Sequence, residues 1–270
     1  MEILKRNYPQ YLIFDKVFNR VLCIVKNSEI LRSYRAKDYL KELSKREKLK
    51  EIEERALELI DLLRREANLN YESFGLSGSC LLNLSRENSD IDLLVYGEKE
   101  SYKVYEVLKE LFKGVLRPIN SWEDFYKRRD SFMDLKAFIF HESRKFQEGK
   151  FKDKEFFIRF IKNDKREKYG KEIYLYKGYV RIKAKVTDDY ESIFTPCCYK
   201  VSEVEVLAGL KVKDIERIIS YRGRFCQQAK LNEKILAQGR VEEVKGKDYS
   251  FHQLVLGEER RDFMLSYEKI

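Results

Sequence analysis

Residues 90–96 read Asp-Ile-Asp-Leu-Leu-Val-Tyr, so two carboxylates alternate with apolar side chains in one short stretch. Successive side chains of a β-strand point to opposite faces of the sheet. A strand here would place Asp90 and Asp92 on one face and Ile91 and Leu93 on the other. The pattern predicts a sheet with one face packed on a core and one face that carries two acids.

The two aspartates need a partner. Residues two apart on one strand lie within roughly 7 Å of each other. Unpaired carboxylates at that distance repel, which raises their pKa values and destabilises the fold. Mg²⁺ removes such repulsion, and it commonly takes one or two carboxylates together with phosphate and water oxygens. The pattern therefore favours a metal–nucleotide site, and the alternative is that Asp90 is an ordinary turn acid after the polar residues 85–89.

A second feature lies ten residues upstream of the acids. Residues 71–76 predict a short strand, and residues 77–79, Ser-Gly-Ser, predict a turn. Gly78 permits a positive φ or a close approach of the backbone to a ligand. Ser79 adds a hydroxyl, and successive backbone N–H groups in such a turn can bind an anion. Together with the acid pair, the turn predicts a phosphate site beside a metal site, although neither half is informative alone.

The sequence around these motifs predicts a mixture of helices and strands. Apolar positions from residue 48 onward recur at steps of three and four, which predicts an amphipathic helix within the charged residues 38–68. The other predicted elements are two short strands within 11–26, a helix at 101–114 with Ser101 as N-cap and Gly114 as its stop, a mostly helical stretch at 121–149 that opens with a capping box of Ser121 and Asp124, and a strand at 155–161.

The C-terminal part has a different character. Residues 172–188 predict two strands around a glycine, and residues 234–257 predict a β-hairpin with Gly-Lys-Asp at its tip. We place a domain boundary in the charged segment 165–171. The predicted units are an α/β domain with an N-terminal β-hairpin at 1–168 and a β-rich, barrel-like domain at 169–270.

Charge and cysteine content narrow the function classes. Lys and Arg outnumber Asp and Glu by 55 to 46, which gives a formal net charge of +9. This balance permits contact with nucleic acid or nucleotides without requiring it. The five cysteines form no C-x-x-C pair, and two histidines do not complete a zinc site. We expect a soluble, cytoplasmic protein with free thiols and no membrane contact, because no signal-peptide core or long apolar run occurs; the Lys and Glu usage fits a thermophile.

The stretch "GLSGS", ten residues and then "DIDLLVYG" resembles the signature of the DNA polymerase beta-like nucleotidyltransferase superfamily. The resemblance covers roughly residues 47–162, and the chain is also similar to archaeal nucleotidyltransferases with a β-rich C-terminal extension. It implies an α+β fold with a mixed-sheet nucleotidyltransferase domain. It also implies that Gly78 and Ser79 bind the β- and γ-phosphates of a nucleoside triphosphate, and that Asp90 and Asp92 hold two Mg²⁺ or Mn²⁺ ions.

The superfamily also uses a third carboxylate on a neighbouring strand, and here the sequence offers two. Glu155 opens the strand at 155–161 and is the first choice, whereas Asp134 lies in a helical stretch. Arg159 shares the face of Glu155 and is a phosphate ligand or a partner of the acids. The basic cluster at 127–129 contacts the triphosphate or acceptor, or it is a solvated helix face. If neither acid serves, the chain keeps the fold without the activity.

These features lead to one main hypothesis and two alternatives. The main hypothesis is transfer of a nucleoside monophosphate from a nucleoside triphosphate to a hydroxyl of RNA or DNA, with release of pyrophosphate. One alternative is a non-catalytic nucleic-acid-binding protein on the same fold. The other is an enzyme that nucleotidylates a small molecule or a protein. The charge and the appended β-rich part favour a nucleic-acid acceptor.

Overall fold

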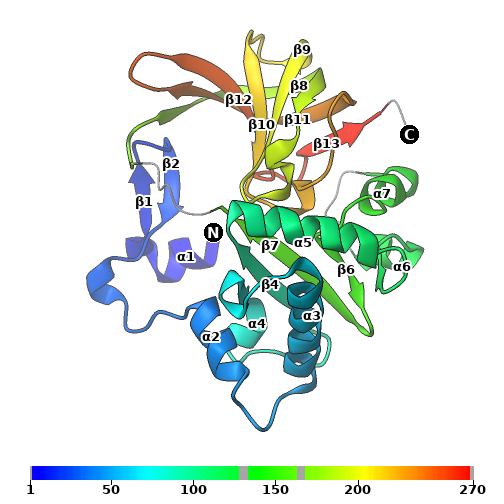
Figure 1. The fold of residues 1–270 in the computed structure, drawn as a ribbon. Coiled ribbons are helices and arrows are strands. Elements are labelled where there is room, and N and C mark those ends of the chain that lie inside the picture. Colours follow the sequence, from blue (N-terminus) through cyan, green and yellow to red (C-terminus); the bar gives the residue numbers. More distant parts are fainter. Residues whose placement is uncertain (1, 128–132, 163–167, 268–270) are drawn as a thin grey trace.

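The computed structural model describes residues 2–127, 133–162 and 168–267, and its strands form two main groups (Figure 1). One group is a mixed sheet covered by helices, and the other is a β-rich C-terminal sheet. This arrangement confirms the predicted α+β class. Within the described ranges, no helix is long and apolar enough to cross a membrane.

The mixed sheet has five strands in the order β3-β4-β7-β6-β5. Its central pair, β4 and β7, runs parallel, and the other pairs run antiparallel. The strands are β3 (Phe74–Leu76), β4 (Ile91–Tyr96), β5 (Leu116–Arg117), β6 (Glu148–Phe151) and β7 (Lys154–Ile161). The parallel pair lies at the centre of the sheet, where it carries the sequence motif.

Helices cover one face of this sheet. α3 (Glu51–Ala67) and α5 (Glu98–Leu111) pack on β4, and α5 also packs on β7. Leu93 of β4 and Ile158 of β7 are fully buried there with Leu59 and Leu63 of α3. The opposite face of β4 and β7 is therefore the one that carries the acids.

The N-terminal segment spans both groups of strands. α2 (Ala36–Leu43) packs against β3, and α4 (Gly78–Leu81) follows β3 directly. The predicted hairpin is present as β1 (Leu12–Asp15) and β2 (Arg20–Cys23), after a short helix α1 (Glu2–Asn7). Its tip contacts the C-terminal sheet, because Phe18 stacks on Tyr174 with 5.4 Å between ring centres.

Five C-terminal strands close into a ring. The pairings run β8-β9-β10-β12-β11 and return to β8, and β13 pairs with the first part of β11, on the edge that β12 occupies further along. β10 and β12 are parallel, and the other pairs are antiparallel. The strands are β8 (Ile173–Asp188), β9 (Cys197–Gly209), β10 (Ile215–Ser220), β11 (Lys234–Lys245), β12 (Ser250–Leu256) and β13 (Phe263–Ser266). A separate apolar core fills the ring. The domain boundary at 165–171 stays a prediction, and residues 163–167 lie outside the described residues.

A buried polar seam joins the two groups. Lys145 is fully buried, and its Nζ donates to Glu142 Oε1 at 2.7 Å and to the carbonyl of Arg224 at 2.8 Å. Arg144 donates to both carboxylate oxygens of Glu233, which precedes β11. Breaking one partner of such a buried ion pair is costly because a buried charge is left uncompensated. The ring is therefore held firmly against the mixed sheet.

Several predicted elements differ from the observed ones. The stretch at 121–149, predicted as mostly helical, holds the helices α6 (Trp122–Lys127) and α7 (Leu135–Glu142) in its described part, but it ends in strand β6. α5 begins at Glu98, so Ser101 is not its N-cap; the buried Ser101 hydroxyl donates to the Gly97 carbonyl. Residues 38–68 form α2 and α3 with a break between them, and residues 172–188 form one strand with an irregularity at Gly178. The capping box of Ser121 and Asp124 is confirmed.

Candidate active site

Asp90 and Asp92 lie on the face of β4 that the helices leave free. Side chains along β4 alternate between buried and partly exposed, and Asp92 is on the partly exposed side. Asp90 immediately precedes the strand. Ile91 pairs with Phe156 of the parallel neighbour β7, so Asp90 and Glu155 immediately precede paired residues at the same end of the two strands. The alternation that the sequence predicts is present, and it brings Glu155 to the same edge as the acid pair.

Gly78 lies directly against the carboxylate of Asp92. A Cβ atom on Gly78 would lie 1.9 Å from Asp92 Oδ2, and the residue has a φ of +61°. Both facts require glycine. The backbone N–H of Ser77 donates to the Asp92 carbonyl at 2.8 Å, and this bond fixes the turn to the strand. The predicted Ser-Gly-Ser turn is thus the entry into α4, which begins at Gly78.

The hydroxyl of Ser79 is buried and has no hydrogen-bond partner among the described residues. Buried polar atoms in native proteins are nearly always paired, because an unpaired one costs about 1–3 kcal/mol. An orphaned hydroxyl one residue after the Gly78 contact indicates a place for a polar ligand atom. This observation points to a ligand independently of the acid pair.

The electrostatics of the acid pair match its geometry. Burial, and then the charge of Asp90, raise the pKa of Asp92 from 3.8 to about 6, while Arg159 lowers it. Arg159 lies on the same face of β7 as Glu155, two residues beyond the partner of Asp92. A raised carboxyl pKa in this setting reflects charge without a sufficient counter-charge. A cation at the site would supply that counter-charge.

The two candidates for a third carboxylate occupy different environments. The Glu155 side chain is 34% exposed, and its Oε1 lies 3.9 Å from Lys127 Nζ. Asp134 is the N-cap of α7, where its Oδ1 accepts from the Ala137 N–H at 2.8 Å. Asp134 therefore has a structural task in place. Arg128 and Arg129 of the basic cluster lie outside the described residues.

The residues present fit a divalent metal with a nucleotide. Asp90 and Asp92 supply two carboxylates on one face, Gly78 leaves room for close approach, and the Ser79 hydroxyl awaits a partner. In the described part of the chain, no three His, Cys, Asp or Glu side chains are grouped closely enough to hold a metal ion together. Two carboxylates with phosphate and water oxygens are nevertheless a usual ligand set for Mg²⁺.

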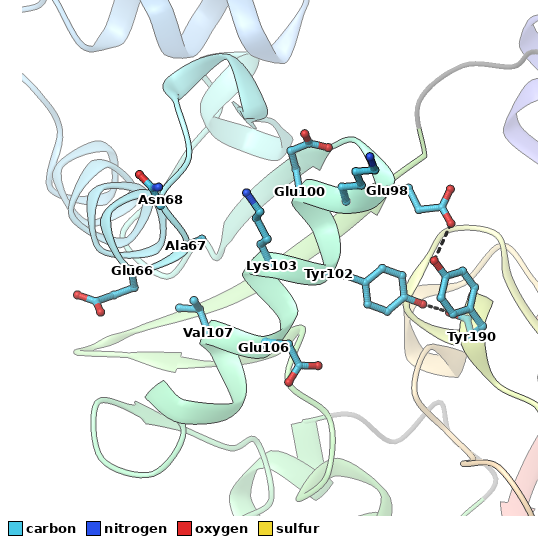
Figure 2. Close-up of a pocket in the computed structure, with 11 residues that line it drawn as sticks. Glu66, Ala67, Asn68, Glu98, Glu100, Tyr102, Lys103, Glu106, Val107 and Tyr190 are labelled. Carbon is cyan, nitrogen blue, oxygen red and sulfur yellow. Dashed lines mark hydrogen bonds between the residues drawn. The ribbon is translucent and has the colours of Figure 1, made fainter.

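Another cavity, of about 1300 Å³, lies elsewhere on the molecule. It opens between the end of α3 and α5, and Figure 2 shows Glu66, Glu98, Glu100 and Glu106 around it. α5 follows the carboxyl end of β4, whereas Asp90 lies at the amino end. Four glutamates and two lysines disfavour a triphosphate electrostatically. This cavity is a poorer nucleotide site than the Gly78–Asp92 region.

The C-terminal part contacts the same face of the sheet. A Cβ atom on Gly223 would lie 2.4 Å from Cζ of Phe157, the β7 residue that pairs with Asp92. Gly223 starts a short turn, η5 (Gly223–Phe225), directly after β10. Sequence reasoning missed this contact, and it missed the bonds from Ser77 to the Asp92 carbonyl. For Ser77, only the Ser-Gly-Ser pattern could have indicated a role in the turn. For Gly223, no feature of the local sequence indicates the contact with Phe157.

The raised pKa of Asp92 makes a prediction about stability. A folded-state pKa of about 6 lies above the ordinary 3.8, so the metal-free protein loses stability as the pH rises through this window. Asp92→Asn removes the charge, and it should stabilise the metal-free protein at about pH 8 by about 1–3 kcal/mol, with little effect near pH 4. Urea unfolding in EDTA across this range measures the difference.

Asp124 provides the matched control for that substitution. Its buried carboxylate accepts hydrogen bonds from Lys150 and Ser121, and although burial opposes them, these bonds lower its pKa. Asp124→Asn should therefore destabilise the protein at neutral pH. A loss of stability in Asp92→Asn comparable to that in Asp124→Asn at about pH 8 would contradict the interpretation of the acid pair.

The chain matches a known protein family. A family model described as a nucleotidyltransferase domain matches residues 36–185, which include the turn, the acid pair and β7. The chain is 30% identical to an uncharacterized protein of Methanocaldococcus jannaschii over 97% of its own length and 78% of that protein's. No solved structure matches the chain. The residues that the family model matches include the turn and the acid-bearing strand of the mixed sheet. The chain belongs to the nucleotidyltransferase domain family.

Proposed function

We propose that the protein transfers a nucleoside monophosphate from a nucleoside triphosphate to a hydroxyl group of a nucleic acid, with release of pyrophosphate and in the presence of Mg²⁺ or Mn²⁺. The observation that carries the proposal is the contact of the Asp92 carboxylate with Gly78, beside the unpaired hydroxyl of Ser79. A phosphate-binding turn and a metal-binding acid are thereby joined in one place. Family membership supports nucleotidyl transfer in general terms.

In the proposed reaction, each residue of the site has one task. The acceptor oxygen forms a bond to the α-phosphorus as the bond from that phosphorus to the bridging oxygen of the β-phosphate breaks. Ser79 would donate its hydroxyl to a phosphate oxygen, and Gly78 would let the phosphate approach the backbone. Asp90 and Asp92 would hold the metal. When bound, the metal neutralises phosphate charge and lowers the pKa of the attacking hydroxyl.

Glu155 and Arg159 complete the proposal on β7. Glu155 immediately precedes Phe156, the residue that pairs with Ile91, and we assign it to accept the acceptor proton. Arg159 is exposed on the same face and its charge acts on Asp92. We propose that the Arg159 guanidinium donates a hydrogen bond to a phosphate oxygen of the triphosphate. Catalysis of this kind depends mainly on positioning and charge neutralisation.

Replacing either acid tests the proposal directly. Asp90→Asn and Asp92→Asn should each lower the incorporation of labelled nucleotide by about a hundredfold or more, because each removes metal affinity and transition-state charge stabilisation. The assay uses total RNA, DNA and cell extract as acceptor pools. Asp153→Asn, an exposed carboxylate in the turn between β6 and β7, is the control and should keep full activity. Absence of nucleotide binding by the wild type with metal present would rule out the enzyme.

The third carboxylate can be assigned by a second pair of variants. Glu155→Gln should lower kcat by about a hundredfold while the pattern of acceptors stays unchanged. Asp134→Asn keeps a good N-cap residue and removes only the charge, so both stability and turnover should be retained. Steady-state kinetics with thermal unfolding measure both quantities. If Asp134→Asn lost turnover and Glu155→Gln did not, the assignment would be reversed.

A substitution of Ser79 distinguishes an effect on triphosphate binding from an effect on the stability of the protein. Ser79→Ala should raise the KM for the triphosphate by about tenfold, because the proposed phosphate contact is lost. Stability of the free protein should not fall, since the buried hydroxyl has no partner to lose. A drop in the unfolding midpoint with an unchanged KM would show a structural role instead. Transfer of nucleotide to small molecules in samples free of nucleic acid would show that the acceptor is a small molecule and not a nucleic acid.

A further inference from the structure

The ring of strands carries a groove on its second and third strands. β8, β9, β10, β12 and β11 pair in a closed circuit with a single parallel pair, β10 with β12. Five-stranded Greek-key rings of this kind bind single strands on the face of their second and third strands. A groove of about 910 Å³ lies on that face here. Such likeness of fold does not establish a function, so the side chains in the groove must carry the argument.

Two cations face the groove side by side. Arg217 of β10 is paired in register with Lys200 of β9, so both side chains leave the sheet on the same side. Lys213, in the turn between these strands, also lines the groove. Lys200 pairs with Asp188 at 3.0 Å, but both side chains are largely exposed, and such a pair is weak. The three cations are therefore available to phosphate groups of a bound strand.

Arg217 is held in a stack with two aromatic rings. Its guanidinium lies over the ring of Phe251, 4.8 Å from the ring centre, and its Nε donates to Gln253 Oε1 at 2.9 Å. Phe251 in turn stacks on the exposed Tyr249, at an interplanar angle of 17°. Among the described residues, the terminal nitrogens of Arg217 form no hydrogen bond or ion pair. A fixed guanidinium beside the half-buried ring of Phe251 and the exposed ring of Tyr249 is a surface on which unpaired bases can stack.

The groove also contains acids, and these favour RNA over DNA. Glu203, Asp214 and Glu216 line it together with the three cations, so the net charge is balanced locally. A purely cationic groove would bind either backbone. Carboxylates can accept hydrogen bonds from 2′-hydroxyl groups, which distinguish RNA from DNA at a given site.

We propose that this groove, formed by β9, β10 and Phe251, binds single-stranded RNA, and that the inference deepens the proposed function by making this RNA the acceptor. β10 ends at Ser220, and Gly223, three residues further along the chain, lies against Phe157, the residue that pairs with Asp92. Gly223 lies six positions beyond Arg217, a chain length of no more than about 22 Å. An RNA strand bound along β10 would therefore extend to the face of the mixed sheet that carries Asp92, and its terminal hydroxyl would lie there.

Binding can be measured without catalysis, which separates this inference from the proposed function. The probe is a fluorescein-labelled single-stranded RNA of about a dozen nucleotides, followed by fluorescence anisotropy in EDTA without nucleotide. Wild type and Asp92→Asn should bind it equally. Arg217→Ala should bind about tenfold more weakly, and the slope of log Kd against log salt should fall by about 0.7, as expected for one lost phosphate contact.

Matched variants control for folding and for general charge. Lys200→Ala changes a largely exposed residue, so it provides a second test that does not endanger the fold. Lys103→Ala removes an equally exposed lysine at the acidic cavity on α5 and should leave binding unchanged. Phe251→Leu should weaken binding several-fold through lost stacking. Single-stranded DNA of the same sequence should bind more weakly than RNA.

The outcomes test the RNA-binding groove and the proposed enzyme activity separately. RNA binding that is lost in Arg217→Ala and Lys200→Ala, in a protein that transfers no nucleotide, would support the groove and remove the proposed enzyme. Nucleotide transfer without any RNA binding would overturn the groove and leave the enzyme. Equal binding of DNA, or an equal loss in Lys103→Ala, would also overturn the RNA groove.

Discussion

The contact between Asp92 and Gly78 is the constraint on which the rest of the site depends. The carboxylate occupies the space that any side chain at residue 78 would need, since a Cβ there would lie 1.9 Å from Oδ2. The turn can pass so close to the strand only with glycine at a positive φ. Ser77 then bonds to the Asp92 carbonyl, and α4 begins in a fixed direction from β4. The position of the Ser79 hydroxyl follows from this chain of contacts.

Two polar groups around the Asp92–Gly78 contact destabilise the ligand-free protein. The pKa of Asp92 is raised to about 6 by burial and by Asp90, and the Ser79 hydroxyl is buried without a partner. Two unsatisfied polar groups next to each other are unusual in a well-packed protein. Local rules are commonly broken at functional sites, where a ligand later satisfies them. A phosphate with a divalent cation would satisfy both groups at once.

Sequence reasoning succeeded where the signal is local. The alternation in residues 90–96 placed Asp90 and Asp92 correctly because strand periodicity reverses with each residue. In the stretch 121–149, the capping box at Ser121 and the mostly helical content were predicted correctly, but β6, which begins at Glu148, was not predicted. β6 has few β-branched residues, and its Gly149 is required by close contact with Phe112, a neighbour distant in sequence. Glu155 could be proposed but not placed, because its position depends on the pairing of β4 with β7.

The same limit explains why the groove on the ring could not be located from the sequence. Lys200, Arg217 and Phe251 come from three strands, and only the closure of the ring places them in one groove. Their position relative to the acids depends in turn on the seam at Lys145, whose buried charge fixes the turn that follows β10. Because an uncompensated charge there would cost several kcal/mol, the seam favours a single orientation of ring and sheet. In the function that we propose, the phosphate chemistry is confined to the mixed sheet, and the choice of acceptor can vary in the ring without disturbing it.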